Sequence, residues 1–257
     1  MIRRRSLMIG TMASVACMPF RAALAAAPTL DEIRKQGYMR IATTGADAPY
    51  NFVGPDGALA GFDIDWSRLI CSGLGVESRF SYLSWNGILP GLMAGQYDGV
   101  MSAVRITPER AANFTFSIPY TSDSVAVMVR QDNTAIKEIE DLRGLVVGTA
   151  SGSILEATAE TMARAGTLRS YPGLPNIIMD LMAGRLDAGV VGRAGALYAI
   201  KTQQLPLKVV GRSINPQPIA MILPRGATEL AEAVSRQIKA RQDDGQAKIL
   251  SERWFGN

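Results

Sequence analysis

The chain has 257 residues, of which 47% are apolar, with 27 lysines and arginines and 23 aspartates and glutamates. It contains no histidine and two cysteines, so histidine-based catalytic triads and zinc sites are excluded. Four of the arginines lie in the first 26 residues, which contain no acidic residue, and the rest of the chain therefore has no net charge. The overall charge thus gives no support for a nucleic acid or a membrane surface as a partner.

Residues 1–26 are typical of a cleaved secretory signal peptide, with a basic start, a short apolar run and a small-residue end at 23–25. The apolar run is shorter than the roughly 20 residues that cross a bilayer, so we expect no membrane insertion. Residues 4–8 loosely fit a twin-arginine signal, and both this route and the general secretory route stay open. The predicted location is the periplasm. Cys17 leaves with the signal peptide and Cys71 remains alone, so no intramolecular disulfide is expected.

Strand and helix patterns alternate along the rest of the chain, which predicts α/β layers with mainly parallel sheets. In chain order, strands are predicted at 38–44, 76–83, 97–105, 124–130, 144–150, 168–172, 186–192, 207–211 and 218–224. Helices are predicted at 61–75, 86–95, 154–166, 175–185, 194–203 and 228–241.

Two stretches of the chain, 89–103 and 178–192, match each other. Each has a helix that ends in Leu-Met-Ala-Gly, followed by a strand that opens on an aspartate. The match indicates two similar α/β units, each with its own sheet. Because ligands of such sheets bind at the carboxyl ends of the strands, the cleft between the two units is the expected site.

The segment MSAVRITPER combines a strand end with the start of a helix. Thr107 suits the N-cap position and Pro108 the first helical position. Arg110 then falls in the first turn, where the helix dipole disfavours cations, and Arg105 lies just upstream. One interpretation is an anion site that binds a carboxylate. The alternative is that Arg110 pairs with Glu109 or points into water.

Several segments, in order along the chain, resemble the extracellular solute-binding proteins of family 3, which deliver polar amino acids and related solutes to ABC importers. They are APYNFVGPDGALAGFDIDW, WNGILPGLMAGQYDGV, ITPERAANFTFSIPY and RWFGN. The resemblance implies a two-lobed periplasmic-binding-protein fold of type II, with two hinge crossings near 120–123 and 215–219. Lobe 1 would comprise 27–119 plus 220–257, and lobe 2 would comprise 120–219. The resemblance also implies that the protein is a monomer and closes on its ligand. It further implies a permease as the partner and no cofactor or metal.

The resemblance also implies binding residues. Arg110 falls at the position of the arginine that binds the ligand carboxylate. The other expected ligand-binding positions that match are Trp85, Ser102, Ala103, Ser151, Gly152 and Ser153. Two plain alternatives stay open: Trp85 belongs to the core, and the two serines of the lobe 2 turn only cap the helix that follows.

Three positions depart from the family pattern. Arg105 replaces a small hydroxyl residue, and Asp47, followed by Tyr50, replaces an aromatic residue. Gly192, followed by Arg193, replaces the aspartate that accepts the ligand's α-ammonium group. Burying an ammonium group without a carboxylate partner costs free energy. These three departures therefore affect which ligands the site can bind.

Two ligand classes remain compatible with these departures. In the first, the ligand is an organic anion without an α-amino group, held by Arg105 and Arg110. In the second, the ligand is an amino acid or a derivative, and Asp47 either pairs with Arg105 or binds the ammonium group.

An enzyme is the alternative from another class, because the early segment also resembles cyclohexadienyl and arogenate dehydratases. Dehydration of such substrates needs a general acid over the cleft. Asp47 and Glu156 are the candidates for that role. Since no histidine is available and Gly192 replaces the lobe 2 aspartate, we expect a binding protein with no catalytic residues.

Overall fold

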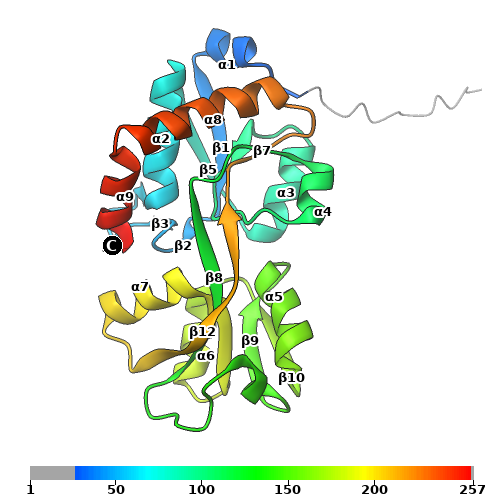
Figure 1. Ribbon diagram of the computed structural model, residues 1–257, viewed down its shortest axis with the longest axis vertical. Coiled ribbons are helices and arrows are strands. Elements are labelled where there is room, and N and C mark those ends of the chain that lie inside the picture. The colour runs from blue at the N-terminus through cyan, green and yellow to red at the C-terminus, as the bar shows by residue number, and fades with distance from the viewer. Residues whose placement is uncertain (1–26, 256–257) are drawn as a thin grey trace, which may run out of the picture.

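The computed structural model describes residues 27–255, and the predicted signal peptide lies outside them. These residues form two α/β lobes, one above the other, joined by two long strands (Figure 1). This is the predicted two-lobed architecture. Within 27–255, no helix combines the length and the apolar character that crossing a membrane requires.

The sheet of the first lobe has the strand order β5-β1-β6-β13-β7. Its strands are β1 (Tyr38–Thr43), β5 (Glu77–Tyr82), β6 (Gly99–Val100), β7 (Thr115–Phe116) and β13 (Ile222–Leu223). β1 pairs in parallel with β5 and β6, whereas β13 returns from the second lobe and is antiparallel to β6 and β7. Of the strand predicted at 97–105, only residues 99–100 form β6, and the irregular segment that follows carries site residues.

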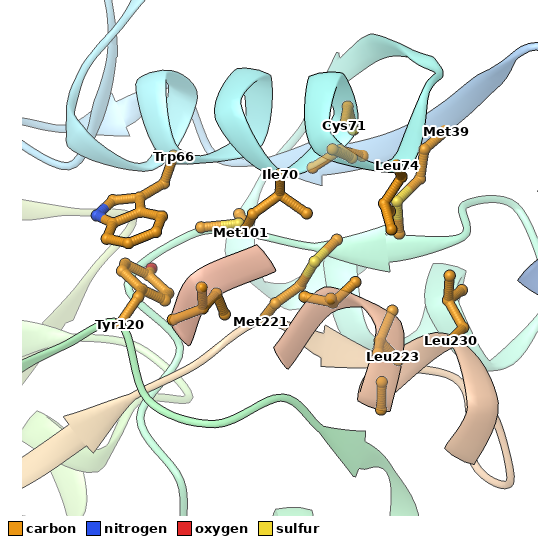
Figure 2. Close-up of a cluster of buried hydrophobic side chains, with 14 of the residues drawn as sticks. Met39, Trp66, Ile70, Cys71, Leu74, Met101, Tyr120, Met221, Leu223 and Leu230 are labelled. Carbon is orange, nitrogen blue, oxygen red and sulfur yellow. The ribbon is translucent and has the colours of Figure 1, made fainter. Parts of the chain in front are cut away.

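Helices surround this sheet: α1 (Leu30–Gln36), α2 (Phe62–Leu74), α3 (Trp85–Met93), α4 (Pro108–Asn113), α8 (Thr228–Asp243) and α9 (Gln246–Phe255). The core packs between α2 and the sheet, and Figure 2 shows Trp66 and Ile70 extending from α2 toward Met101 and Met221. Tyr120 faces Trp66, with the ring centroids 5.8 Å apart. Burying a large apolar side chain contributes about 1.5–3 kcal/mol, so this core anchors the chain where it leaves the first lobe.

A small antiparallel sheet, which the sequence patterns did not predict, lies beside the first lobe. It consists of β2 (Ala46–Asp47), β3 (Asn51–Val53) and β4 (Leu59–Ala60). Strands of two or three residues are too short to show an alternating pattern, which explains the omission. The sheet places Asp47 and Tyr50 at the junction of the two lobes.

The sheet of the second lobe has the order β10-β9-β11-β8-β12. Its strands are β8 (Thr121–Arg130), β9 (Val146–Ala150), β10 (Thr167–Tyr171), β11 (Ala188–Gly192) and β12 (Leu207–Ile219). Its helical segments are η1 (Ile139–Leu142), α5 (Ile154–Thr158), η2 (Ala159–Ala163), α6 (Leu174–Met182) and α7 (Arg193–Gln203). The sheet is mixed, because β8 is antiparallel to both β11 and β12.

Two details of the predicted pattern are wrong. The sheets are not mainly parallel, because the strands that pass between the lobes pair with their neighbours in antiparallel fashion. The strand predicted at 207–211 continues as β12 to Ile219, with irregular pairing near Ile214, and the strand predicted at 218–224 covers the end of β12 and β13. Parallel neighbours need a long crossover connection, usually a helix, whereas antiparallel neighbours do not. The strands that pass between the lobes can therefore pair with their neighbours in antiparallel fashion.

β8 and β12 form the connection between the lobes, and they pair where they cross, at Ser122 with Pro218 and Asp123 with Gln217. In Figure 1 the two strands run side by side from the upper to the lower lobe. The lobe boundaries given above, which divide the chain at 119 and 219, stay a prediction.

The two matching stretches have the same local structure. α3 and α6 each end before a glycine with positive φ, Gly95 (+70°) and Gly184 (+72°). The aspartate that follows accepts a hydrogen bond from a backbone N–H of the neighbouring strand, with Asp98 bound to Arg40 at 2.7 Å and Asp187 to Val146 at 2.8 Å. The two lobes thus contain similar units, as the sequence match predicted.

Candidate ligand-binding site

A cavity of about 220 Å³ lies between the lobes, at the carboxyl ends of β1, β6, β9 and β11. An apolar cavity of about 150 Å³ already holds benzene, so this one can hold a single small solute. Nine of the eleven predicted site residues line it: Asp47, Tyr50, Trp85, Ser102, Ala103, Arg105, Arg110, Ser151 and Ser153.

The other two predicted residues do not line the cavity. Gly152 lies beside it, where its carbonyl accepts a hydrogen bond from Trp85. Arg193, the first residue of α7, is not part of the lining, contrary to the prediction. Gly192 lines the cavity, whereas the guanidinium of Arg193 lies near Asp123 and lowers the pKa of that carboxylate against the raising effect of burial.

Arg110 faces the cavity from the first turn of α4. Thr107 is the N-cap, as predicted, and its side chain accepts a hydrogen bond from the backbone N–H of Arg110 at 3.2 Å. Nη1 of Arg110 donates to the carbonyl of Arg105 at 3.0 Å, and the guanidinium lies 5.1 Å from the ring centre of Trp85. These contacts hold the guanidinium in place against the cavity.

The charge of Arg110 has no counter-ion. Within residues 27–255 no carboxylate forms an ion pair with it, so the predicted alternative of a pair with Glu109 is wrong. Burial lowers the pKa of Arg110, and the nearby charge of Arg105 lowers it further. Both effects disfavour the charged form, and an entering anion would relieve them. Arg110 is therefore the residue best placed to bind a carboxylate.

Arg105, in contrast, has a partner. Its Nη2 donates to Oδ2 of Asp123 at 2.8 Å, and both side chains are buried, with 10% and 6% exposed. Oδ1 of Asp123 also accepts hydrogen bonds from the backbone N–H groups of Ser124 and Ala194, at 2.8 and 3.2 Å. The predicted alternative in which Asp47 pairs with Arg105 is wrong, because Asp123 occupies that role.

Gly192 leaves room for this ion pair. A Cβ atom at position 192 would lie 3.0 Å from Oδ2 of Asp123 and 3.2 Å from Nη2 of Arg105. The aspartate that the family pattern places at 192 is missing, and the carboxylate of Asp123 lies next to the vacated position. Sequence reasoning missed Asp123, although a buried arginine requires a carboxylate and the predicted crossing ends on one.

Asp47 lines the cavity with a free carboxylate. No hydrogen bond to its side chain is found within residues 27–255, and a Cβ at Gly195, on α7 of the second lobe, would lie 3.7 Å from its Oδ1. Burial raises the pKa of Asp47 to about 7, although the positive charge of Arg105 opposes the shift. An ammonium group bound here would stabilise the ionised form.

Asp63, on α2, holds the irregular segment after β6 in place. It accepts hydrogen bonds from the backbone of Ala103 at 2.8 Å, from Asn51 at 3.0 Å and from the hydroxyl of Tyr120 at 2.6 Å. Ala103 itself has a φ of +47°, a left-handed conformation that a non-glycine residue adopts only when neighbouring contacts fix it. The buried carboxylate of Asp63 thus connects Ala103, in the site, to Tyr120, at the start of the first crossing.

The predicted serines are largely engaged by the protein. The hydroxyl of Ser102 accepts from the backbone N–H of Thr44 at 3.1 Å and contacts the hydroxyl of Thr44 at 3.2 Å. Ser153 caps α5, because its hydroxyl accepts from Leu155 and donates to Ala150. The capping alternative is therefore correct for Ser153, which also lines the cavity.

The lobes touch across the cavity. Nε1 of Trp85, from α3 in the first lobe, donates to the carbonyl of Gly152 in the second lobe at 3.0 Å. The φ of Gly152 is +65°, which favours glycine in this turn. Trp85 is only partly buried and lines the cavity, so it is not simply a core residue. The structure describes a closed arrangement of the two lobes.

The second lobe supplies an apolar surface that the sequence patterns did not predict. We call this set the apolar wall, and it consists of Ile154, Leu155, Pro172, Leu174, Ile177 and Val191. We call the ionisable set from the first lobe and the crossing strand the charged wall, and it consists of Asp47, Arg105, Arg110 and Asp123. No group of three or more potential metal ligands occurs within 27–255.

A family model for bacterial extracellular solute-binding proteins, family 3, matches residues 39–257. The chain belongs to this family. The match covers both lobes and both crossing strands, and it agrees with the resemblance seen in the sequence.

Known relatives of this solute-binding protein extend over nearly its whole length. The L-cystine-binding protein TcyJ of Escherichia coli is 32% identical over 228 residues, covering 88% of this chain and 86% of the relative. The octopine-binding periplasmic protein of Rhizobium meliloti is 29% identical, with 84% and 89% covered.

Solved structures with the same fold include an ancestral arginine-binding protein bound to glutamine. It has a TM-score of 0.82 and 32% identity, and the match covers 86% of this chain and 99% of the other. The ancestral amino-acid-binding protein AncCDT-1, a precursor of cyclohexadienyl dehydratase, has a TM-score of 0.82 and 33% identity, with 88% and 99% covered. All four of these proteins are described as binding proteins, and one of them is a precursor of an enzyme.

Proposed function

We propose that this protein captures an α-amino acid between its two lobes in the periplasm, acts as a monomer, and delivers the ligand to the permease of an ABC importer. The ligand's carboxylate binds Arg110, and its ammonium group binds Asp47. The observation that carries the proposal is the contrast between the two arginines. Arg105 is neutralised by Asp123, whereas Arg110 faces the cavity without a carboxylate.

The charges of the cavity fit a zwitterion better than an organic anion. Two arginines and two aspartates line it, and one of each forms the Arg105–Asp123 pair. One free cation, Arg110, and one free carboxylate, Asp47, then remain for the ligand. A dianion would leave Asp47 facing a second negative charge, which is unfavourable at a site of low dielectric constant.

The closed arrangement supports capture by lobe closure. The ligand would contact the charged wall and the apolar wall at once, and a ligand that contacts both lobes stabilises the closed state by its differential affinity. The relatives support amino acids and their derivatives as the ligand class, because those named above are described as binding cystine, octopine, arginine or amino acids.

A thermal-shift panel tests the proposal. The mature protein would be unfolded and refolded to remove bound solute, and then mixed with amino acids, monocarboxylates and dicarboxylates. At about 100 times its dissociation constant, a ligand adds roughly 2.7 kcal/mol to the free energy of unfolding. We expect stabilisation by at least one α-amino acid. Stabilisation by dicarboxylates alone would contradict the proposal.

A dehydratase is the second candidate, because Asp47 combines a place in the cavity with a pKa of about 7, a value suited to a general acid at neutral pH. The other candidate acid, Glu156, does not line the cavity, and its carboxylate accepts hydrogen bonds from Gly152 and Ser170. Incubation with prephenate or arogenate would decide between the candidates. We expect no turnover, and product formation that Asp47→Asn abolishes would establish the enzyme.

A further inference from the structure

We propose that the amino acid bound in this cavity has an uncharged, apolar side chain, and that cationic and acidic side chains are rejected. The inference rests on the proposed function and concerns the part of the ligand beyond its carboxylate and ammonium groups. It follows from which residues of the cavity are free to pair with a ligand and which are already paired.

Among the described residues, Asp123 on the crossing strand, which is paired with Arg105, is the one charged lining residue of the second lobe. The other lining residues of this lobe are the six of the apolar wall, together with Ala150, Ser151, Ser153, Gly173, Gly192 and Gly195. The wall is assembled from three places, the start of α5, the segment from β10 into α6, and the end of β11. An extended apolar surface of this kind favours an apolar group and leaves a charged one without a partner.

The ligand's own carboxylate and ammonium groups pair with the two members of the charged wall that have no partner, Arg110 and Asp47. Asp123 is occupied at both oxygens, by Arg105 at 2.8 Å and by two backbone N–H groups. Asp47 is then the one free carboxylate among the described lining residues, and the α-ammonium group takes it. A lysine or arginine side chain would bring a second cation into a closed cavity with no carboxylate left to bind it.

The same reasoning excludes acidic side chains. Arg105 is paired with Asp123 and Arg110 is taken by the α-carboxylate, so among the described lining residues no cation without a carboxylate partner remains for a glutamate side chain. The cavity volume of about 220 Å³ further limits the ligand to a single amino acid of moderate size. Two amino acids linked through their side chains, such as cystine, would place a second zwitterion against the apolar wall.

Norleucine and lysine form the matched pair for the test, because they differ only in the terminal group of an unbranched four-carbon side chain. We would measure both dissociation constants by isothermal titration calorimetry with refolded, ligand-free protein, and add cystine and glutamate as further ligands. We expect norleucine to bind at least 100-fold more tightly than the other three.

A pair of variants connects the result to the apolar wall. Ile154 lines the cavity but belongs to none of the buried core clusters, and it is the first residue of α5, where an acidic side chain is tolerated. Ile154→Glu should weaken norleucine binding and strengthen lysine binding at least tenfold. The neutral control of equal size, Ile154→Gln, should weaken norleucine binding without any gain for lysine.

The possible outcomes separate this inference from the proposed function. If lysine, glutamate or cystine binds as tightly as norleucine or more tightly, the apolar side chain is refuted while the amino-acid ligand stands. If no amino acid binds and a dicarboxylate does, the proposed function fails, and this inference fails with it. If Ile154→Glu and Ile154→Gln changed the dissociation constant for lysine equally, the proposed role of the apolar wall would also be contradicted.

Discussion

The charged wall and the apolar wall face the same cavity but are built in different ways. The charged wall comes from the two-residue strand β2, the irregular segment after β6 and the short helix α4, together with the long crossing strand β8. The apolar wall comes from the ends of regular strands and helices in the second lobe. In the proposed function, the first lobe and hinge would fix the ligand's ionic groups, while the second lobe would contribute the surface for its side chain.

Within the charged wall, the two arginines have opposite roles, and substitutions distinguish them. Arg105→Gln should lower the free energy of unfolding by about 3–5 kcal/mol, because it leaves the buried carboxylate of Asp123 without its partner. Urea-induced unfolding measures the change. The control is Arg79→Gln, since Arg79 and Glu77 form an exposed pair whose loss should change the free energy by less than about 1 kcal/mol.

Equal effects of Arg105→Gln and Arg79→Gln would show that the Arg105–Asp123 pair does not support the hinge. The double variant Arg105→Gln/Asp123→Asn sharpens the test. It should lose less stability than the sum of the two single variants, because it removes both charges together.

The effect of Arg110→Gln should fall on ligand binding instead of on stability. We expect the dissociation constant to rise about 100-fold, which corresponds to roughly 2.7 kcal/mol, while the unliganded protein keeps its stability because an unpaired charge is removed. Calorimetric titration and urea unfolding of the same sample measure the two quantities. Arg110→Lys, which keeps the charge but loses the planar fork, should recover part of the affinity. A large loss of stability with unchanged affinity would assign Arg110 a structural role.

Asp47 should make binding depend on pH, with a smaller effect. Its pKa of about 7 means that the unliganded protein holds a proton there at pH 6, and a bound ammonium group requires that proton to leave. The affinity should therefore rise as pH increases from 5 to 7, by up to about tenfold per unit, and level off above pH 8. Isothermal titration between pH 5 and 9 measures the profile, and Asp47→Asn should flatten it.

The same shift affects the stability of the unliganded protein. Because the pKa of Asp47 is raised on folding, the folded state holds its proton to higher pH than the unfolded chain does, and stability is lost as pH rises from about 4 to 7. Asp47→Asn should then add up to about 4 kcal/mol to the free energy of unfolding at pH 8 and almost nothing at pH 4. If Asp47→Asn changed the free energy of unfolding equally at pH 4 and pH 8, the raised pKa of Asp47 would be contradicted.

Much of the fold followed from the sequence. Most of the longer helices and strands of both lobes lie close to their predicted positions, because long periodic segments carry a clear signal, whereas α1 and α9 were not predicted. The N-cap at Thr107 and the helix start at Pro108 are also as predicted. The three short strands beside the first lobe and the antiparallel crossings were missed, since two-residue strands show no periodicity and pairing direction depends on the path of the chain.

For the site, the residue types pointed to the right segments but not to the partners. Arg105 stands where the family pattern has a small hydroxyl residue, so the sequence pointed to this position. Its partner, Asp123, lies 18 positions away on the first crossing strand. Only the folded arrangement brings these two residues together beside Gly192. The apolar wall was missed for a similar reason, because its residues resemble ordinary core residues until the cavity is seen.

The proposed contact that most strongly determines the ligand class is the one between Asp47 and the ammonium group of an amino acid. Leucine and 4-methylpentanoate differ only in that group, so their dissociation constants should be measured at pH 8 with the native protein and with Asp47→Asn. We predict that the native protein prefers leucine by at least 100-fold, and that Asp47→Asn reduces this preference at least tenfold. Equal binding of the two compounds by the native protein, or a preference unchanged by Asp47→Asn, would contradict the claim.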